Sequence, residues 1–321
     1  AADGRAFAWV PRKAGARGAV DAGLMPGLLP GGRVLGDAGP VADAWSRLPE
    51  APGLDTRGML RAAADGRLQA LYLVGVDPIR DFEDSALARA ALERVDTVIV
   101  QDLLETDTTR FADVVLPAAA PQERVGSFTT WEGRRQAFPQ VVPPPARCQE
   151  DWDIIRQLAR VMDADLGWET AMDVRREAAP LMAAEQSYLA RLAGIASAPP
   201  AEVERDDDTL AVEAVPSLIG RGSMLRGADA LLATARPPAA WVHPDDARRA
   251  GISDGDVAVI AGPDGRIELP VRVTEQVASG CVRLPQNATD DPLGVLADPQ
   301  ADVPGPVRVR LQARETADAG A

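Results

Sequence analysis

The chain has 321 residues, of which 46% are hydrophobic, so it can bury a sizeable core over about two domains. Its 48 acidic and 34 basic residues give a net charge of −14, which disfavours binding to nucleic acid or to acidic lipid. The sequence holds no apolar run long enough to span a membrane and no secretory signal segment, so we expect a cytoplasmic protein that meets protein partners or small ligands.

The first third of the chain begins with a segment that looks like a piece of a longer polypeptide, since AADGRAFAWV lacks an initiator methionine. Residues 10–57 are rich in glycine, proline and arginine, which predicts a long ordered loop with short helical turns. Apolar runs at 70–74, 97–100 and 113–117 then bracket a helical pattern at 84–94. This alternation predicts parallel strands that are buried on both faces.

A second group of elements follows after residue 150. The sequence predicts a helix from 150 to 162 and another over roughly 170–193. The proline-rich and acidic stretch 196–208 is the best candidate for a linker. Short β-branched runs between 209 and 312, with turn signals every 8 to 12 residues, predict a small barrel or sandwich, followed by a tail over 313–321.

Metal and redox sites are limited by the count of ligands. The chain has two cysteines, Cys148 and Cys281, and a single histidine, His243. An iron–sulfur cluster or a structural zinc ion needs four cysteine or histidine ligands, so we expect no metal site in these 321 residues. A Ser-His-Asp triad would have to use His243, and no serine lies in a GxSxG elbow that joins a strand to a helix, so we expect no catalytic residue either. Cys281 is better explained as a small buried residue, and His243 as part of the start of a helix at Pro244.

The turns after two of the predicted strands are candidate ligand positions, because ligands of open α/β sheets bind beyond the carboxyl ends of the strands. The first turn is Gly75-Val76-Asp77-Pro78, and the second holds Gln101-Asp102 with Thr106. An ordinary tight turn is the favoured explanation of the first, because GxDP is a common turn sequence. The sequence has neither GxGxxG nor GxxxxGK[ST], so no motif indicates a nicotinamide or nucleoside triphosphate site.

Several of these stretches together resemble the molybdopterin oxidoreductase family. The turn at Gly75–Pro78 is similar to the family's GxNP or GxDP turn, and Ala112–Pro117 with the later Glu132-Gly133-Arg134 is similar to its ADVVLP and NxEGRxQ blocks. Residues 243–256 and 284–287 resemble its C-terminal dinucleotide-binding barrel. Residues 11–32 resemble a loop typical of one branch of the family, the large G subunits of NADH-quinone oxidoreductase (respiratory complex I).

The resemblance implies a fold and a division into domains. It implies an α/β, parallel-sheet, Rossmann-like molybdopterin-oxidoreductase domain over residues 1–195, a linker over 196–208 and a double-psi β-barrel over 209–312. The G subunits carry iron–sulfur clusters that pass electrons from NADH toward quinone. On this resemblance the present residues form a cofactor-free scaffold, and the clusters are expected in an N-terminal part that lies outside them.

The leading hypothesis is therefore the C-terminal part of a complex I G subunit, with the other subunits of the hydrophilic arm as partners. It would lie at the cytoplasmic side of the inner (plasma) membrane without inserting into it. The sequence departs from the pattern of the molybdenum enzymes, since Thr130 stands where many relatives have asparagine and Ser127 stands where threonine is usual. The first change removes an amide that could both donate and accept hydrogen bonds.

The alternative is the C-terminal half of a molybdopterin-dependent oxidoreductase of the formate dehydrogenase type. The resemblance then implies that molybdopterin guanine dinucleotide is bound at five positions, Gly75, Asp77, Asp102, His243 and Asn287. The sequence upstream of this chain would discriminate the two hypotheses by its cysteine motifs. A third hypothesis, a free-standing binding module, would require a native start codon near Ala1.

Overall fold

The structure is a computed structural model that describes residues 11, 13–145, 147–182, 208–263, 265–287, 289–290, 293–297 and 307–314. The chain forms two compact units. Unit one comprises residues 1–59 and 116–201, and unit two comprises residues 60–115 and 202–321. The linker predicted at 196–208 lies outside the described residues except for Asp208, so the predicted domain boundary stays a prediction.

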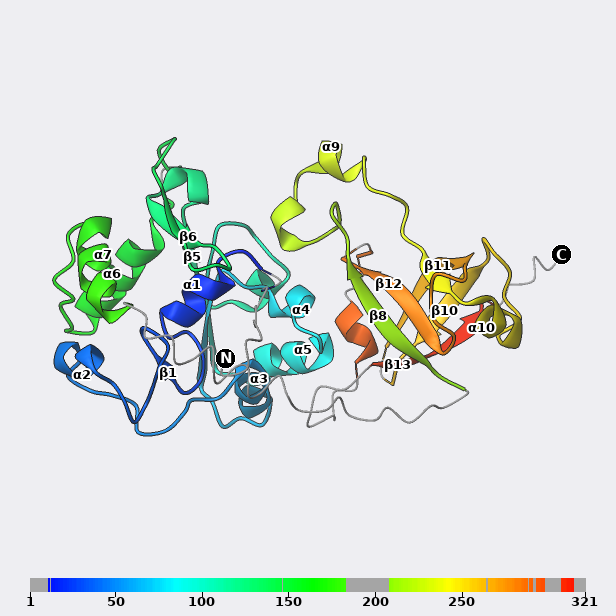
Figure 1. Cartoon of the computed structure of the whole chain (residues 1–321), viewed down its shortest axis with the longest axis horizontal. Coiled ribbons are helices and arrows are strands. Elements are labelled where there is room, and N and C mark those ends of the chain that lie inside the picture. Colours follow the sequence, from blue (N-terminus) through cyan, green and yellow to red (C-terminus); the bar gives the residue numbers. More distant parts are fainter. Residues whose placement is uncertain are drawn as a thin grey trace, which may run out of the picture. The chain divides into compact units, whose positions relative to one another are not determined.

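Unit one consists of short helices, two small antiparallel β-sheets and connecting loops (Figure 1). Its elements are α1 (Ala16–Asp21), β1 (Leu28–Leu29), β2 (Arg33–Val34), α2 (Pro40–Ala44), η2 (Pro121–Glu123), β6 (Gly126–Thr129), β7 (Arg135–Phe138), α6 (Asp151–Val161) and α7 (Ala171–Leu181). A small core of Leu29, Val41 and Leu181 holds the N-terminal segment against α7. The Arg33 guanidinium reinforces this contact, because its Nη1 donates to the Leu181 carbonyl oxygen at 2.7 Å.

The α/β part is built around a sheet with strand order β3-β4-β5, and it belongs to unit two except for residues 56–59 and 116–117 at its two ends. Its elements are α3 (Thr56–Ala64), β3 (Ala70–Val74), α4 (Pro78–Asp81), α5 (Ser85–Arg94), β4 (Thr97–Asp102), η1 (Thr108–Phe111) and β5 (Val114–Pro117). Strands β3 and β4 are parallel, with Leu71 opposite Val98. Leu60 of α3 and Leu87 of α5 pack with these residues in one buried cluster, which confirms the predicted βαβ arrangement.

Several positions of this sheet are not buried as the sequence predicted. Tyr72 and Val74 of β3 are each 42% exposed, and Val114 and Val115 of β5 are 45% and 49% exposed. The expectation that the strands are buried on both faces is therefore wrong for these positions. An apolar run predicts that a strand is buried. Which of its side chains are covered depends on the elements that pack against the sheet.

The C-terminal part of unit two is a closed barrel of six strands in the order β10-β11-β9-β12-β8-β13 (Figure 1). Its strands are β8 (Leu210–Pro216), β9 (Ala240–Val242), β10 (Val257–Ala261), β11 (Arg266–Val273), β12 (Cys281–Gln286) and β13 (Arg308–Ala313). Two pairs, β8 with β12 and β9 with β11, are parallel, whereas the other pairs are antiparallel. Together with the parallel sheet, the barrel confirms the predicted fold class.

The barrel core follows from the alternation of side chains along its strands. In β11, Ile267, Leu269 and Val271 are buried and the residues between them are exposed, as expected for a strand with one face inward. Ile260 of β10 and Leu284 of β12 are completely buried in the same cluster. Shorter elements lie between the strands: η3 (Ser223–Leu225), α9 (Asp229–Leu232), α10 (Pro244–Arg249) and η4 (Leu293–Leu296).

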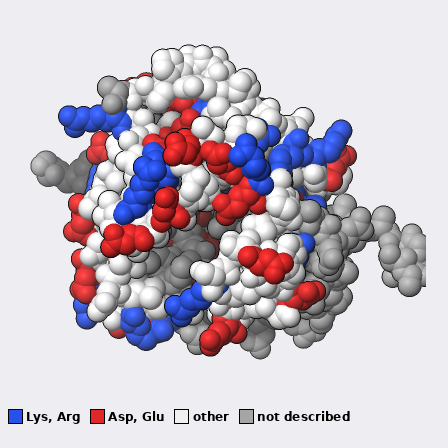
Figure 2. Space-filling view, turned by 90° about the vertical axis from the view of Figure 1, so that its left-hand side faces the viewer, with Lys and Arg blue, Asp and Glu red and all other residues white. Residues whose placement is uncertain are grey.

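Charged side chains of both signs are mixed on the face of the molecule in Figure 2. Acidic and basic groups lie next to one another there and do not gather into one extended basic field. No described helix is long and apolar enough to pass through a bilayer.

Candidate functional site

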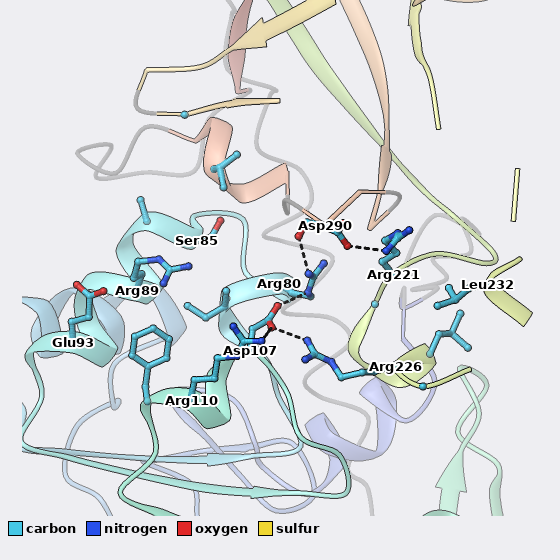
Figure 3. Close-up of a pocket in the computed structure, with 18 of the residues that line it drawn as sticks. Arg80, Ser85, Arg89, Glu93, Asp107, Arg110, Arg221, Arg226, Leu232 and Asp290 are labelled. Carbon is cyan, nitrogen blue, oxygen red and sulfur yellow. Dashed lines mark hydrogen bonds and ion pairs between the residues drawn. The ribbon is translucent and has the colours of Figure 1, made fainter. Parts of the chain in front are cut away.

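One candidate site is a cleft of about 890 Å³ within unit two (Figure 3). Helices α4, α5 and η1 form one wall, and residues 221–232 with Gly265, Asp290 and Val295 form the other. Nine charged side chains line it: Arg80, Arg89, Glu93, Asp107, Arg110, Arg221, Arg226, Asp229 and Asp290. The cleft thus concentrates five arginines in a chain whose net charge is −14.

Ion pairs and hydrogen bonds join the two walls of the cleft. Asp107 accepts from Arg80 Nε at 2.7 Å through one carboxylate oxygen and from Arg226 Nη2 at 2.8 Å through the other. Arg80 Nη2 also donates to the Asp290 carbonyl oxygen at 2.7 Å, and the Asp290 carboxylate accepts from Arg221 Nη1 at 2.9 Å. Figure 3 shows Asp107 between Arg80 and Arg226 at the centre of this network.

The electrostatics of Asp107 follow from these contacts. Burial alone would raise the pKa of Asp107, but hydrogen bonds and charges from Arg226 and Arg80 outweigh it and hold the pKa below its ordinary value of 3.8. The hydrogen bond to Asp107 in turn raises the pKa of Arg226. The carboxylate is therefore ionised at neutral pH and stabilises the folded state through its two guanidinium partners.

We expect Asp107→Asn to lower the free energy of unfolding by about 1 kcal/mol at neutral pH, after allowance for solvent screening of this partly exposed site. Because the folded pKa is lowered, this contribution is present above pH 3.8 and is lost as the pH falls through the folded value. Urea unfolding between pH 7 and pH 3 measures the difference, which should shrink at acidic pH. Asp229→Asn, an equal charge change at an exposed position of the same cleft, is the control and should have little effect.

Two of the sequence-predicted residues, Gly75 and Asp102, lie at the carboxyl ends of β3 and β4. Gly75 has a left-handed backbone with φ of +61°, its N–H donates to the Gln101 carbonyl oxygen at 2.8 Å, and a Cβ added there would meet open space. Asp102 accepts from the Leu103 N–H at 2.7 Å. Burial raises the pKa of Asp102, and the charges of Asp77 and Asp81 raise it further. These two positions are open to a ligand.

Asp77, the third predicted residue of this turn, is used inside the protein. The residue is only 1% exposed, and its carboxylate accepts from Thr108 Oγ1 at 2.6 Å and from the Asp107 N–H at 3.4 Å. These bonds tie the loop after β3 to the loop after β4. Asp77 therefore positions Asp107 for the ion pairs of the cleft.

His243 and Asn287, the remaining two predicted residues, lie in the barrel. His243 directly precedes α10, and its Nδ1 accepts from the Asp245 N–H at 3.2 Å. His243 thus caps the N-terminus of the helix, in line with the interpretation from the sequence. Asn287 follows β12 with a left-handed φ of +54°, and its carbonyl oxygen accepts from the Arg221 N–H. Asn287 thus fixes the backbone of the loop that carries Arg221 into the cleft.

The structure brings Gly75, Asp77 and Asp102 to one edge of the sheet, whereas His243 and Asn287 follow two different barrel strands. None of the five lines the cleft. Asp77 uses both carboxylate oxygens within the protein, and His243 uses its Nδ1, so Asp77 in particular does not fit as a contact to a pterin dinucleotide. Their role in binding one stays a prediction, and we derive no chemical step through such a cofactor.

The residues of the cleft were missed by reasoning from the sequence. Arg80 and Asp107 are 27 positions apart, and Asp107 and Arg226 are 119 positions apart, so no local spacing connects them. The one available signal was the pair of arginines in RGSMLRG, close to the start of the barrel. Among the described residues, no group of three or more His, Cys, Asp or Glu side chains is arranged to hold a metal ion, and both cysteines are free.

Comparison with known proteins gives two family matches. Residues 9–161 match the family model for molybdopterin oxidoreductase, and residues 222–305 match that for the molybdopterin dinucleotide binding domain. Among solved structures, the chain is similar to acetylene hydratase from Pelobacter acetylenicus, with a TM-score of 0.59 at 16% identity. That similarity covers 82% of this chain and 47% of the hydratase, and it supports the fold alone.

The curated relatives are longer than this chain. It is 37% identical to the G subunit of the NADH-quinone oxidoreductase of Streptomyces coelicolor over 93% of its length, and 36% identical to that of Mycobacterium bovis over 89%. It spans 36% of each of these relatives, or about a third. It is 28% identical to the alpha subunit of the F420-dependent formate dehydrogenase 2 of Methanococcus maripaludis, over 83% of this chain and 45% of the relative. The chain belongs to the molybdopterin oxidoreductase family.

Proposed function

We propose that this chain is the C-terminal part of the G subunit of an NADH-quinone oxidoreductase and serves there as a scaffold without a cofactor of its own. The observation that carries the proposal is the difference in identity, which is 36–37% to the two G subunits named above and 28% to the formate dehydrogenase named with them. In the whole subunit, iron–sulfur clusters would pass electrons from NADH toward quinone. The present residues would hold that electron-carrying part in place.

The hydrogen bonds of the residues that would contact a cofactor support the scaffold proposal. Asp77, one of the residues expected to touch a dinucleotide, uses both carboxylate oxygens within the protein, and His243, another, uses Nδ1 at the start of α10. Thr130, which stands where many molybdenum enzymes have asparagine, accepts through Oγ1 from the Arg134 N–H at 3.1 Å and so stabilises the β6–β7 turn. Each group has a structural use that requires no cofactor.

Exposed apolar side chains support contacts with neighbouring subunits. In unit one, Phe128 is 46%, Trp131 48%, Met172 55% and Val141 73% exposed. Large apolar side chains that cluster on a surface often mark sites of protein association. We infer that they meet other subunits of the hydrophilic arm, at the cytoplasmic side of the inner (plasma) membrane.

The proposal is tested by tagging the full reading frame that contains this chain and isolating the tagged protein from its native cells. We expect it to co-purify with flavin, iron–sulfur clusters and NADH:quinone oxidoreductase activity, and with molybdenum and tungsten far below one atom per chain. Stoichiometric molybdenum or tungsten, measured by plasma mass spectrometry, or stoichiometric pterin would overturn it.

The second candidate function is that of a molybdopterin-dependent oxidoreductase of the formate dehydrogenase type. The match of residues 222–305 to a dinucleotide binding domain favours it. Gly75 and Asp102 would then bind one guanosine at the open sheet edge, with Asp77 behind them, and His243 and Asn287 would bind the other. Metal analysis of the same tagged protein separates this candidate from the first.

A further inference from the structure

Two buried polar atoms in the wall of the cleft have no partner within the described part of the chain. One is Oγ of Ser85, a residue that is 4% exposed. The other is Nη1 of Arg80, whose side chain is 9% exposed. Buried polar atoms are nearly always hydrogen-bonded, and an unsatisfied one costs free energy unless a ligand pairs with it. Two such donors in one cleft therefore indicate a place for an acceptor.

The Arg80 guanidinium is held in a fixed orientation. Its Nε binds Asp107 and its Nη2 binds the Asp290 carbonyl oxygen, so Nη1 is the nitrogen that remains for another acceptor. Ser85 begins α5, and Figure 3 shows it on the same wall as Arg80 and Arg89. A ligand would meet donors that are already positioned, which lowers the entropic cost of binding.

The remaining charges of the cleft favour an anion. Asp107 and Asp290 are balanced by Arg226 and Arg221 through the ion pairs described above. Arg80 and Arg110 also contact Asp107, at 2.7 Å and 3.9 Å, and Arg89, Glu93 and Asp229 complete the charged lining. Five arginines thus face four carboxylates, which leaves an excess of one positive charge. A guanidinium group matches the geometry of phosphate oxygens, and a serine hydroxyl adds a further donor.

The cleft also has room and an apolar surface for the organic part of a ligand. Its volume of about 890 Å³ lies within the range of small-molecule sites. Ile79, Leu225, Leu232 and Val295 contribute apolar lining, and the Arg89 guanidinium lies 5.7 Å from the centre of the Phe111 ring.

We propose that this cleft binds the phosphate group of a small phosphorylated molecule, with Arg80 Nη1 and Ser85 Oγ as donors and Arg89 and Arg110 as further cations. Its lining includes neither Gly75 nor Asp102, the sheet-edge positions where the family resemblance would place a pterin dinucleotide. It does not depend on the proposed scaffold function, because it concerns a small ligand and not assembly.

The test is isothermal titration calorimetry of the full chain with inorganic phosphate and with adenosine monophosphate, a phosphate ester with an organic body. We expect both to bind and acetate, a carboxylate of the same charge sign, to bind more weakly. Ser85→Ala should weaken phosphate binding about tenfold, as expected for the loss of one hydrogen bond to a charged group. In the absence of phosphate the same variant should be at least as stable as the unchanged protein, because it removes an unsatisfied buried hydroxyl.

A matched pair of arginine variants controls for general electrostatics. Arg89→Gln and Arg94→Gln carry the same change of charge on α5, but only Arg89 lines the cleft. We expect Arg89→Gln to weaken binding and Arg94→Gln to leave it within about twofold, since distant exposed charges are screened by salt. The proposal is overturned if phosphate produces no binding heat, if both variants weaken binding equally, or if Ser85→Ala binds phosphate as the unchanged protein does. Molybdenum analysis and subunit co-purification are separate measurements, so failure here leaves the proposed function untouched.

Discussion

Asp77→Ala is expected to lower the free energy of unfolding by about 3 kcal/mol. Asp77 is 1% exposed, and its removal leaves the hydroxyl of Thr108, which is completely buried, without its acceptor at 2.6 Å. The Asp107 N–H loses its contact with the same carboxylate. The loop that carries Asp107 then loses its anchor, and the ion pairs across the cleft weaken with it. Urea unfolding followed by circular dichroism measures the change.

Three further variants identify the cause. Asp77→Asn retains an oxygen that accepts from Thr108 and should lose less than half as much stability as the alanine variant. Asp81→Ala, at an exposed position of the same short helix, should change stability by less than about 0.5 kcal/mol. Adding Thr108→Val to the Asp77→Ala protein should lower the free energy of unfolding only slightly further, because the two residues act through one hydrogen bond. An Asp77→Ala protein of unchanged stability would show that Asp77 has no structural role and would make it a candidate ligand contact again.

Leu284→Ala is expected to lower the free energy of unfolding by about 3 kcal/mol, within the range of about 2–5 kcal/mol that is usual when a buried leucine is replaced by alanine. Leu284 is completely buried and lies in β12, which pairs in parallel with β8 and in antiparallel with β9. The closed barrel restricts how far its strands can move to fill the space, because each is hydrogen-bonded on both sides. Unfolding monitored by urea titration should show a lower midpoint with an unchanged slope.

The matched control is Leu218→Ala, which removes the same atoms from a side chain that is 98% exposed. Its effect should lie within about 0.5 kcal/mol of zero. Equal losses at both positions would contradict the assignment of Leu284 to the barrel core. A lower slope for Leu284→Ala alone would instead mean that the barrel loosens before the rest of the chain unfolds.

The sequence predicted most of the elements that surround the site. The run ALYLV became β3, and the helix expected over 84–94 is α5 at Ser85–Arg94, with Asp84 accepting from the Leu87 N–H as its cap. The prediction works there because hydrophobic periodicity and capping are local properties. The sequence also predicted that Gly75, Asp77 and Asp102 lie at one edge of the sheet, because parallel strands bring their carboxyl ends together.

Helix α6 shows where local pattern fails. Its apolar residues recur at helical spacing, yet Ile154 is the residue of this helix that is buried, whereas Ile155 is 41% exposed and Met162, which follows its end, is 78% exposed. The period of a sequence fixes which residues share a helix face. Which face is covered depends on the neighbours, and those are set by contacts across long stretches of chain.

The sequence by itself determined that this chain has a parallel α/β part and a barrel, and that its cysteines and histidine are too few for a metal cluster, since strand patterns and ligand counts need no partner to be known. Only the tertiary structure decided how its charged groups are used. It left Ser85 Oγ and Arg80 Nη1 without a hydrogen-bond partner among the residues that the structure describes. It also placed Asp107 between Arg80 and Arg226 and turned Asp77 inward onto Thr108. These are pairings between side chains far apart in the sequence, and their energies depend on distance and burial, which arise only when the strands and helices pack.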